Sequence, residues 1–566
     1  MQPESAPQSQ LATILPLHER RDGRETNPNR VLGHLVSLTG LQGVISSKMN
    51  LPGGGDHWSI GHLITVVHET TRLVGVVTEI STTNSQWDDE TVNMAHVKIE
   101  LNGEIVDEAP GKPVFYRGIR TFPTLGAIAH RIRSGDLKAI YSFRGGESVV
   151  IGSLTQNAAI PASVSIQELV TRHFAVVGST GVGKTTSVSM LLRKCLESRK
   201  NLRILILDPH NEYKRHFPDT AIALDSDSLE LPFWMFRFDE MVDIIYSGKK
   251  ANTDEIEALY EVIRTAKGRF SATAAPQAGA ASALRRPLAS EGSGSASADS
   301  PVPYRISDAL AIIDEWSGKL DQRYPRSDLR ALRQRLETLS RDPRYRFMFG
   351  KFTVDDNITK ILGRIFRIPT MGAPVTVVQM AGLPNEVVNS VVSVLARMAF
   401  EIAMWSGGGY EIAVVCEEAH RYIPSDQSQA FGPTRVAIGR IAKEGRKYGV
   451  SLGVVTQRPS ELDATVLSQC STMFAMRLAN ENDKAIVRGA VGASSAGAIN
   501  FLSSIADREA IAFGEAIPTP MRMKFADYRQ ASASAPAEPP QADPFELRRI
   551  IARLRGEYTS ETAELK

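Results

Sequence analysis

A short glycine-rich segment, GSTGVGKTT, occupies residues 178–186 and carries the clearest chemical signal in the chain. It fits the pattern G-x-x-x-x-G-K-[ST], and an apolar stretch precedes it. Glycines let backbone N–H groups curl around phosphate oxygens, and the start of the following helix adds a positive end. Lys184 is predicted to reach the β- and γ-phosphates, and the Thr185 hydroxyl to ligate Mg²⁺. The predicted nucleotide-binding residues are Gly178, Ser179, Thr180, Gly181, Val182, Gly183, Lys184, Thr185 and Thr186.

Two adjacent acids, Glu417 and Glu418, end a second apolar run, EIAVVCEEAH. In P-loop ATPases, an acid at the end of a neighbouring strand holds Mg²⁺ through water, and an adjacent glutamate can polarise the attacking water. We assign Glu417 to the metal and Glu418 to the catalytic base. A solvated strand end is the alternative for the pair alone, and the P-loop elsewhere in the chain argues against it.

Gln457 and Arg446 are further candidates, each with a structural alternative. Gln457 ends the apolar run VSLGVVTQ, where a polar side chain beside the P-loop strand can sense the γ-phosphate. The alternative is that it begins a turn before Pro459. Arg446 belongs to the basic helix end IGRIAKEGRKYG, and it either caps that helix or faces phosphate.

Arg172 lies twelve residues before Lys184, just ahead of the P-loop strand. The residues alone favour an ordinary surface arginine at this position. No HExxH motif or other paired metal-ligand spacing accompanies the histidines, so a metal centre made only of protein side chains is not predicted.

From about residue 170, apolar runs alternate with helical stretches. Strands are predicted at FAVVG, LRILILD, PVTVVQM, EIAVVCEE, VSLGVVTQ and STMFAMRL. Runs that are apolar throughout suit strands buried on both faces, with crossover helices between them. The pattern predicts an α/β fold with a parallel sheet over 161–527, interrupted by a helical insertion at 225–350.

Residues 28–160 have a β texture instead. The segments VLGHLVSL, HLITVVH, TRLVGVVTEIS and MAHVKIEL are short, rich in Val, Ile, Leu and Thr, and separated by turn residues. This spacing predicts a small N-terminal β-barrel, and the pair Asn102-Gly103 predicts a hairpin turn. Residues 1–27 are polar, and we expect them to be disordered.

Two segments are too poor in apolar residues to form a core. Residues 271–300 hold 22 Ala, Ser, Gly or Pro residues among 30, so we expect a disordered loop inside the insertion. Residues 528–544 are predicted to be a linker to a C-terminal helix within 545–566. We expect that helix to dock on a neighbouring subunit or on a partner protein. Its apolar stripe consists of Leu547, Ile550, Ile551 and Leu554.

The composition excludes several classes of protein. With 566 residues, 42% of them hydrophobic and 23% charged, the chain is too long for one core and too apolar for a disordered protein. The 65 basic and 63 acidic residues nearly balance, which disfavours a globally basic nucleic-acid binder but permits a local basic surface. No run of about 18 apolar residues and no secretory pattern occur, so we expect no membrane span. Three scattered cysteines fit a reducing cytoplasm.

Taken together, these motifs resemble those of the HerA-type ATPases, in the same superfamily as the FtsK DNA pumps. The resemblance covers roughly 28–527 and rests on the barrel and on GSTGVGKTT at 178–186, DPHNEY at 208–213, LPFW at 231–234, DPRYRFMF at 342–349, AGLPNE at 381–386, EEAHRYIP at 417–424 and EGRKYGVSLGVVTQRPSELD at 444–463. The chain departs from the family pattern at Glu417, where Asp is usual, at Asn211, where Gly is common, and in its long Ala/Ser loop.

The resemblance implies a RecA-like core with a helical insertion behind a β-barrel assembly domain, arranged as a homo-hexameric ring. It implies ATP- and Mg²⁺-dependent movement along double-stranded DNA, as a translocase or helicase. It also implies a partner, either a NurA-like nuclease or a sirtuin-like effector, in DNA end processing or phage defence.

Residue by residue, the resemblance makes Lys184 and Thr185 the phosphate and Mg²⁺ residues, Glu418 the catalytic acid and Gln457 the sensor. Arg446 would act within its own subunit, and Arg172 would be offered to the neighbouring subunit's ATP. Two other functions stay open. One is an ATP-gated ring scaffold that regulates an attached effector without processive DNA translocation. The other is a nucleotide kinase, which the length and the lack of a recognisable lid disfavour.

Overall fold

The computed structural model describes residues 30–49, 58–83, 92–143, 146–246, 252–274, 297–319, 323–350, 355–426, 431–491, 499, 501–527 and 544–555. The predicted disorder of 1–27 lies outside these residues, as do most of the predicted loop 271–300 and of the linker 528–544. The described chain divides into two compact units between Ser142 and Phe143, and each is described by itself.

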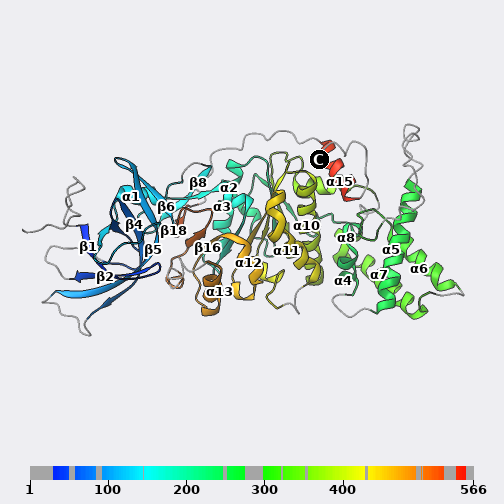
Figure 1. Cartoon of the computed structure of the whole chain (residues 1–566). Coiled ribbons are helices and arrows are strands. Elements are labelled where there is room, and N and C mark those ends of the chain that lie inside the picture. The colour runs from blue at the N-terminus through cyan, green and yellow to red at the C-terminus, as the bar shows by residue number, and fades with distance from the viewer. Residues whose placement is uncertain are drawn as a thin grey trace, which may run out of the picture. The chain divides into compact units, whose positions relative to one another are not determined.

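The first unit is a closed antiparallel barrel (Figure 1). Hydrogen-bonded neighbours follow the order β2-β1-β7-β3-β4-β5, and β2 also pairs with β5, which closes the six strands into a ring. Strand β6 extends β5 outside the ring, and the predicted small barrel is confirmed. Its elements are β1 (Val31–Thr39), β2 (Gln42–Met49), β3 (Leu63–His68), β4 (Thr71–Thr82), β5 (Asn93–Ala109), β6 (Lys112–Arg117), β7 (Ile128–Arg131) and α1 (Ser134–Ile140).

The hairpin predicted at Asn102-Gly103 is wrong, because β5 runs straight through this pair. The register against β4 shifts here, with Val74 opposite Gly103 and Gly75 opposite Leu101, so the extra residue forms a bulge. A Cβ at Gly103 would lie 2.4 Å from the carbonyl oxygen of Tyr116 on β6. The glycine therefore permits the close approach of β6 instead of making a turn.

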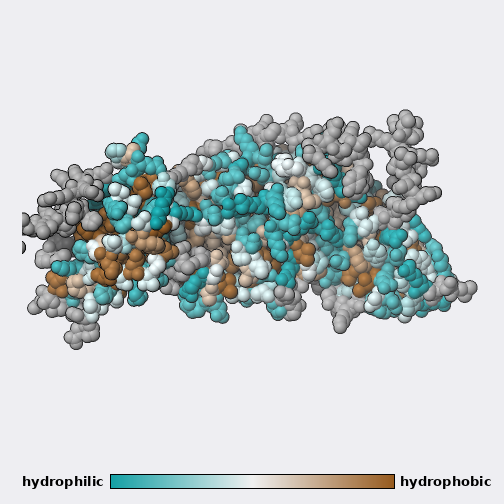
Figure 2. Space-filling view, viewed as in Figure 1, coloured by the Kyte–Doolittle hydropathy of each residue, from teal (hydrophilic) through white to brown (hydrophobic). Residues whose placement is uncertain are grey.

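The barrel unit keeps apolar side chains at its surface as well as in its core, and Figure 2 shows brown areas on this unit between the teal ones. Isolated exposed apolar residues are ordinary, whereas a group of them on one small unit is typical of a contact surface. The large exposed apolar residues of this unit are Val31, Val36, Leu41, Ile60, Val92, Met94, Phe122 and Leu125.

The second unit is built on an eleven-stranded sheet in the order β12-β13-β11-β14-β15-β10-β16-β17-β18-β8-β9. The strands from β12 to β16 are parallel, and the remaining strands join them antiparallel. The predicted α/β fold is confirmed. The strands are β8 (Ser148–Leu154), β9 (Pro161–Ser165), β10 (His173–Val177), β11 (Leu202–Asp208), β12 (Ala221–Leu224), β13 (Val375–Gln379), β14 (Glu411–Cys416), β15 (Val450–Thr456), β16 (Cys470–Ala475), β17 (Glu509–Gly514) and β18 (Met521–Phe525).

The boundary between barrel and core falls earlier than the predicted residue 160. Strands β8 and β9 have the texture of the barrel strands, but β8 pairs with β18 at the far end of the core sheet. Residues 148–165 therefore belong to the second unit, because a pairing with a strand some 370 residues later in the chain places them there.

Helices α10 and α11 pack against each other and against β14 and β15, while α3 packs against β10 and β8. Within α10, Val387–Trp405 is long and apolar enough to cross a membrane, but 89% of that window is buried inside the protein. The core helices are α2 (Ile166–Thr171), α3 (Lys184–Ser198), α9 (Ile358–Phe366), α10 (Asn385–Trp405), α11 (Gly432–Tyr448), α12 (Ala464–Gln469), α13 (Glu481–Val491) and α15 (Pro544–Leu554). Short 3₁₀ turns are η2 (Lys214–His216), η3 (Phe233–Met235), η6 (Pro343–Tyr345), η8 (Ala419–Arg421) and η9 (Pro459–Glu461).

A group of helices occupies residues 238–349, within the predicted helical insertion. They are α4 (Phe238–Tyr246), α5 (Thr253–Ala274), α6 (Ile306–Gly318), α7 (Arg326–Arg341) and α8 (Arg346–Phe349). The apolar stripe of α7 faces inward, with Leu329, Leu332 and Leu336 each no more than 3% exposed.

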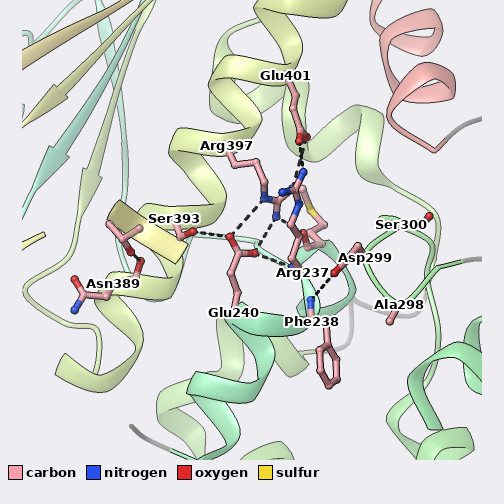
Figure 3. Close-up of polar contacts among 12 residues, drawn as sticks. Arg237, Phe238, Glu240, Ala298, Asp299, Ser300, Asn389, Ser393, Arg397 and Glu401 are labelled. Carbon is pink, nitrogen blue, oxygen red and sulfur yellow. Dashed lines mark hydrogen bonds and ion pairs between the residues drawn. The ribbon is translucent and has the colours of Figure 1, made fainter. Parts of the chain in front are cut away.

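A buried ionic network joins this insertion to α10 (Figure 3). Glu240 on α4 accepts hydrogen bonds from Ser393 at 2.6 Å and from the Arg397 guanidinium at 2.9 Å, and both donors lie on α10. Arg237 donates to Glu401, one turn beyond Arg397, at 2.8 Å. Since buried charges are tolerated only when they are paired, removing one partner from this network is expected to be strongly destabilising. The insertion is thereby fixed to the core helix.

The chain near residue 300 is fastened to α5 in a different way. The Lys267 ammonium is fully buried and donates to the carbonyl oxygens of Ala298 at 2.5 Å and Ser300 at 2.6 Å. Burial lowers the pKa of this lysine to about 7. Asp299 accepts a hydrogen bond from the Phe238 backbone N–H on α4 at 2.9 Å, which completes the attachment (Figure 3).

The C-terminal helix α15 docks on its own chain, against α9 and α10, and not on a neighbouring subunit or a partner as predicted. Of the predicted apolar stripe, Leu547, Ile550 and Ile551 are each no more than 4% exposed, and Leu554 is half-buried. Beyond the stripe, Arg555 makes a two-pronged ion pair with Asp356, and Arg553 donates to the carbonyl oxygen of Trp405 at 2.9 Å. The sequence predicts the stripe but does not reveal that α9 and α10 of the same chain cover it.

Substituting Ile550 by Ala should loosen this helix. The site is 1% exposed, and an Ile→Ala change in a packed core costs about 2–5 kcal/mol. We expect hydrogen exchange of the α15 amides to accelerate by roughly 30-fold or more, since each 1.4 kcal/mol is a factor of ten. The exposed Arg549→Ala on the same helix is the matched control, and equal exchange in both variants would contradict the docking.

Candidate active site

The loop between β10 and α3 has the backbone of a phosphate cradle. Gly181 and Gly183 adopt φ values of +80° and +96°, which side chains rarely permit. A Cβ on Gly178 would lie 2.8 Å from the Cβ of Met476, so this glycine lets β16 approach closely. Lys184 opens α3 and donates to the carbonyl oxygen of Ser179 at 3.0 Å, which holds its ammonium over the loop.

Three neighbouring parallel strands bring polar residues to the same edge as this loop. Because β10, β14 and β15 run parallel, their carboxyl ends meet beside the loop, as expected for ligand sites in such sheets. Burial lowers the pKa of Lys184, and the carboxylates of Glu417, Glu418 and Glu212 act in the opposite direction. The lysine thus faces three acids, two of which are the predicted pair.

Glu417 is the inner acid of that pair. It is 4% exposed and accepts a hydrogen bond from the Tyr213 hydroxyl at 2.5 Å. Burial raises its pKa to about 7, although the Tyr213 hydrogen bond pulls the pKa down. Tyr213 is itself fixed, because its backbone N–H donates to Asp208 at 2.9 Å.

Glu418 lies on the turn after β14 with a left-handed φ of +50°. Such a backbone is strained for a residue with a side chain, and strain of this kind is frequent at functional sites. One carboxylate oxygen lies 3.3 Å from Nδ1 of His420, which also contacts the Thr456 hydroxyl at 3.0 Å. Burial lowers the pKa of His420, and Glu418 opposes the shift. The two carboxylates therefore have different neighbours: Glu418 lies beside His420, and Glu417 beside Tyr213.

Gln457 follows β15 directly and contacts the P-loop. The Thr180 hydroxyl donates to its side-chain carbonyl oxygen. Strand β15 is the hydrogen-bonded neighbour of β10, as the sensor role requires. The structure brings Gln457, the two acids and the P-loop to one place.

Thr185, the predicted Mg²⁺ ligand, donates its hydroxyl to Glu212 at 2.7 Å. Among the described residues, no three His, Cys, Asp or Glu side chains are placed to hold a metal by themselves. A hydroxyl with carboxylates nearby is nevertheless a hard oxygen donor set that fits Mg²⁺ carried with the phosphates of a nucleotide.

Comparisons with known proteins agree with this geometry. The family described as "Helicase HerA, central domain" matches residues 149–399. The DNA double-strand break repair helicase HerA of Pyrococcus furiosus is 25% identical over 455 residues, which span 72% of this chain and 74% of its own. Over these residues the chain is similar to the HerA-type ATPases. Its enzymatic activity is ATP hydrolysis.

Two further similarities extend over much of the chain. The probable helicase MJ1565 of Methanocaldococcus jannaschii is 23% identical over 522 residues, covering 88% of this chain and 90% of its own. Among solved structures, VirB4 of Thermoanaerobacter pseudethanolicus is 13% identical, with a TM-score of 0.47, over 68% of this chain and 98% of its own.

Arg172 and Arg446, the two remaining HerA-type candidates, lie at the opposite edge of the sheet from the P-loop. Arg172 immediately precedes β10, and Arg446 is in the last turn of α11, just before β15. With a rise of about 3.3 Å per residue, strands of five to seven residues separate them from the loop by roughly 20 Å. Arg446 therefore does not reach the P-loop of its own chain, and the implied role within its own subunit does not fit this structure.

Both arginines lie near the hydrogen bonds that His173 makes to α11 and β15. His173, next to Arg172, hydrogen-bonds the carbonyl oxygen of Ala442 on α11 at 2.9 Å and accepts from the Leu452 N–H at 3.0 Å. Arg172 is held by Glu168 at 2.6 Å, and its side chain is 25% exposed. Arg446 is exposed. Neither arginine therefore reaches the nucleotide site of its own chain, and each can act only on a site elsewhere.

Sequence reasoning did not assign roles to Glu212 and Tyr213, although both lie in the quoted motif DPHNEY. The signal was present, since a polar segment directly after a buried parallel strand falls at the ligand edge. The missing information was which of these side chains turns toward Thr185 and which toward Glu417. Only the chain path after β11, with Asn211 at a φ of +59°, decides it.

Proposed function

We propose that this chain is an ATP-driven translocase or helicase of double-stranded DNA that works as a homo-hexameric ring. One observation carries the proposal: helicase relatives match the barrel and the ATPase core together, over 522 residues in one case. The exposed apolar residues of the barrel unit support a role for that unit in ring assembly. Arg172 and Arg446, remote from their own P-loop, support a nucleotide site shared between subunits.

The residues divide the chemistry as follows. Backbone N–H groups of the loop and Lys184 hold the phosphates and stabilise negative charge as it develops in the transition state. Glu418 orients the attacking water and takes its proton. Gln457, in contact with Thr180, reports whether the γ-phosphate is present. Thr185 and Glu417 would hold Mg²⁺, which supplies charge neutralisation at the phosphate oxygens.

We also propose a protein partner, a NurA-like nuclease or a sirtuin-like effector, and a place of action in the cytoplasm. The relatives' name, DNA double-strand break repair helicase HerA, supports a role in DNA end processing, and phage defence is the alternative. The free thiols of the three cysteines suit a reducing compartment.

The test is ATP hydrolysis by the purified protein with and without linear double-stranded DNA. We expect DNA to stimulate hydrolysis, and the stimulation to fall steeply with salt because phosphate contacts release counterions. Lys184→Ala is the inactive control, since it removes the charge that faces the phosphates. Displacement of a triplex-forming strand from the same DNA then measures movement. Hydrolysis without displacement would favour the ATP-gated scaffold over the translocase.

A further inference from the structure

The P-loop has two flanks, and the predicted pair Glu417 and Glu418 lies on one of them. Strand β15 borders β10 on one side, and β14 lies beyond it, so Glu417, Glu418 and Gln457 all gather there. Strand β16 borders β10 on the other side, followed by β17 and β18. Because the γ-phosphate must lie toward the acids and the sensor, the nucleoside end of ATP leaves along the flank of β16 and β17.

Arg508 stands on that second flank. Strand β17 runs antiparallel to β16, so its first residues return to the edge of the sheet where the P-loop lies. The Arg508 N–H donates to the carbonyl oxygen of Val182 at 2.9 Å, and its own carbonyl oxygen accepts from the Phe525 N–H at 2.9 Å. With a φ of +61°, Arg508 is held in a left-handed conformation between the P-loop and the end of β18.

The side chain of Arg508 crosses the end of the phosphate loop. A Cβ on Gly183 would lie 2.9 Å from Cγ of Arg508, so the arginine stem passes directly over this glycine. The guanidinium reaches Asp527 at 3.4 Å, with the two side chains 36% and 49% exposed. An ion pair this exposed contributes little to stability.

A second arginine on the same flank provides a contrast. Arg477 donates to Asp507 at 2.7 Å, and its carbonyl oxygen accepts from the Ser179 N–H at 2.9 Å. Its backbone thus supports the start of the loop, on the far side from Gly183. Arg508 is the arginine whose stem lies at the end of the loop, where α3 begins and the nucleoside must pass.

We propose that Arg508 and Asp527 form the nucleoside end of the nucleotide site. The Arg508 guanidinium lies over the face of the base, where the cation and the aromatic ring attract each other. The Asp527 carboxylate accepts hydrogen bonds from the ribose hydroxyls. Stacking of this kind tolerates different bases, so the pair recognises a nucleoside triphosphate and not adenine in particular. The assignment rests on the proposed ATP site, and it names the residues that hold the part of ATP remote from the chemistry.

The test is equilibrium binding of ATP and of inorganic tripolyphosphate to the full-length protein without DNA. Arg508→Met keeps the stem over Gly183 but removes the guanidinium. We expect ATP and GTP each to bind about tenfold more weakly, because the free energy of one partly buried cation–π contact corresponds to roughly that factor in Kd. Tripolyphosphate has no ring, so its affinity should not change. Arg477→Met, on the same flank, should change neither ligand.

The variant Asp527→Asn tests the ribose contact independently. It should weaken ATP while leaving 2′,3′-dideoxy-ATP bound as tightly as in the unchanged protein. Equal losses for ATP and tripolyphosphate in Arg508→Met would make the arginine a phosphate ligand and overturn the proposal, as would no loss at all. Failure of the unchanged protein to bind either ligand would instead reject the ATP site itself, and unchanged tripolyphosphate binding shows that each variant is folded.

Discussion

Replacing Glu418 by Gln should reduce ATP hydrolysis by about 10²–10⁴-fold while ATP still binds, because the amide keeps the shape of the side chain but cannot accept a proton. The structure sharpens this expectation. Glu418 is 5% exposed and lies on a left-handed turn, so the substitution keeps the side chain at the same place. A steady-state assay gives the rate, and binding of a labelled ATP analogue gives the affinity.

Glu417→Gln is the matched comparison, since it makes the same chemical change one residue earlier. Its carbonyl oxygen can still accept from Tyr213, so the buried packing should survive. We expect its main defect in the Mg²⁺ concentration needed for half-maximal activity, because an amide is a weaker partner for the hydrated cation. If Glu417→Gln has the lower maximal rate while still binding Mg·ATP, the two roles are reversed.

The features of the fold that depend on local sequence patterns could be predicted from the sequence. The P-loop can be predicted from the sequence because glycine spacing, a preceding apolar strand and a following helix coincide within about twenty residues. The buried parallel strands could be predicted as well, since each is a largely apolar run. The predicted strand LRILILD has the same boundaries as β11. Residues such as Gln457 follow from these strands, because a strand end fixes the edge on which its next residue lies.

Long-range pairing decides what sequence reasoning missed. Strands β8 and β9 look like the barrel strands before them, and only their pairing with β18 assigns them to the core. Asn102-Gly103 has the composition of a turn, yet the barrel uses Gly103 for a close approach by β6. The amphipathic stripe of α15 shows that something covers it, but not that α9 and α10 of the same chain do.

The same limit applies inside the site. Arg446 was placed near its own nucleotide because it clusters with a motif, whereas the direction of α11 carries it to the other edge of the sheet. Arg508 lies 325 residues after Gly183 and is brought to it by an antiparallel reversal, for which no local pattern gives a signal. Short motifs therefore identify the chemistry, and the strand order identifies the residues that complete it.

Arg172→Ala should leave ATP binding and ring assembly intact and lower hydrolysis by about 10³-fold or more, the scale of an arginine supplied by a neighbouring subunit. The residue is roughly 20 Å from its own P-loop, so its loss cannot disturb that loop directly. Glu168→Gln is the control, because it breaks the same ion pair and keeps the arginine. If Glu168→Gln is as inactive as Arg172→Ala, the ion pair and not the arginine is what matters.

Mixed rings separate action between subunits from a role in the fold. A Lys184→Ala subunit still carries Arg172, and an Arg172→Ala subunit still carries Lys184, so some interfaces in a mixed ring join an intact P-loop to an intact arginine. Activity should then partly return, in proportion to the fraction of such interfaces. A mixture no more active than either variant alone, with mixed rings confirmed by mass, would exclude action between subunits for Arg172. The same mixture made with Arg446→Ala would then test the other arginine at that edge, since both lie beside the contact that His173 makes with α11.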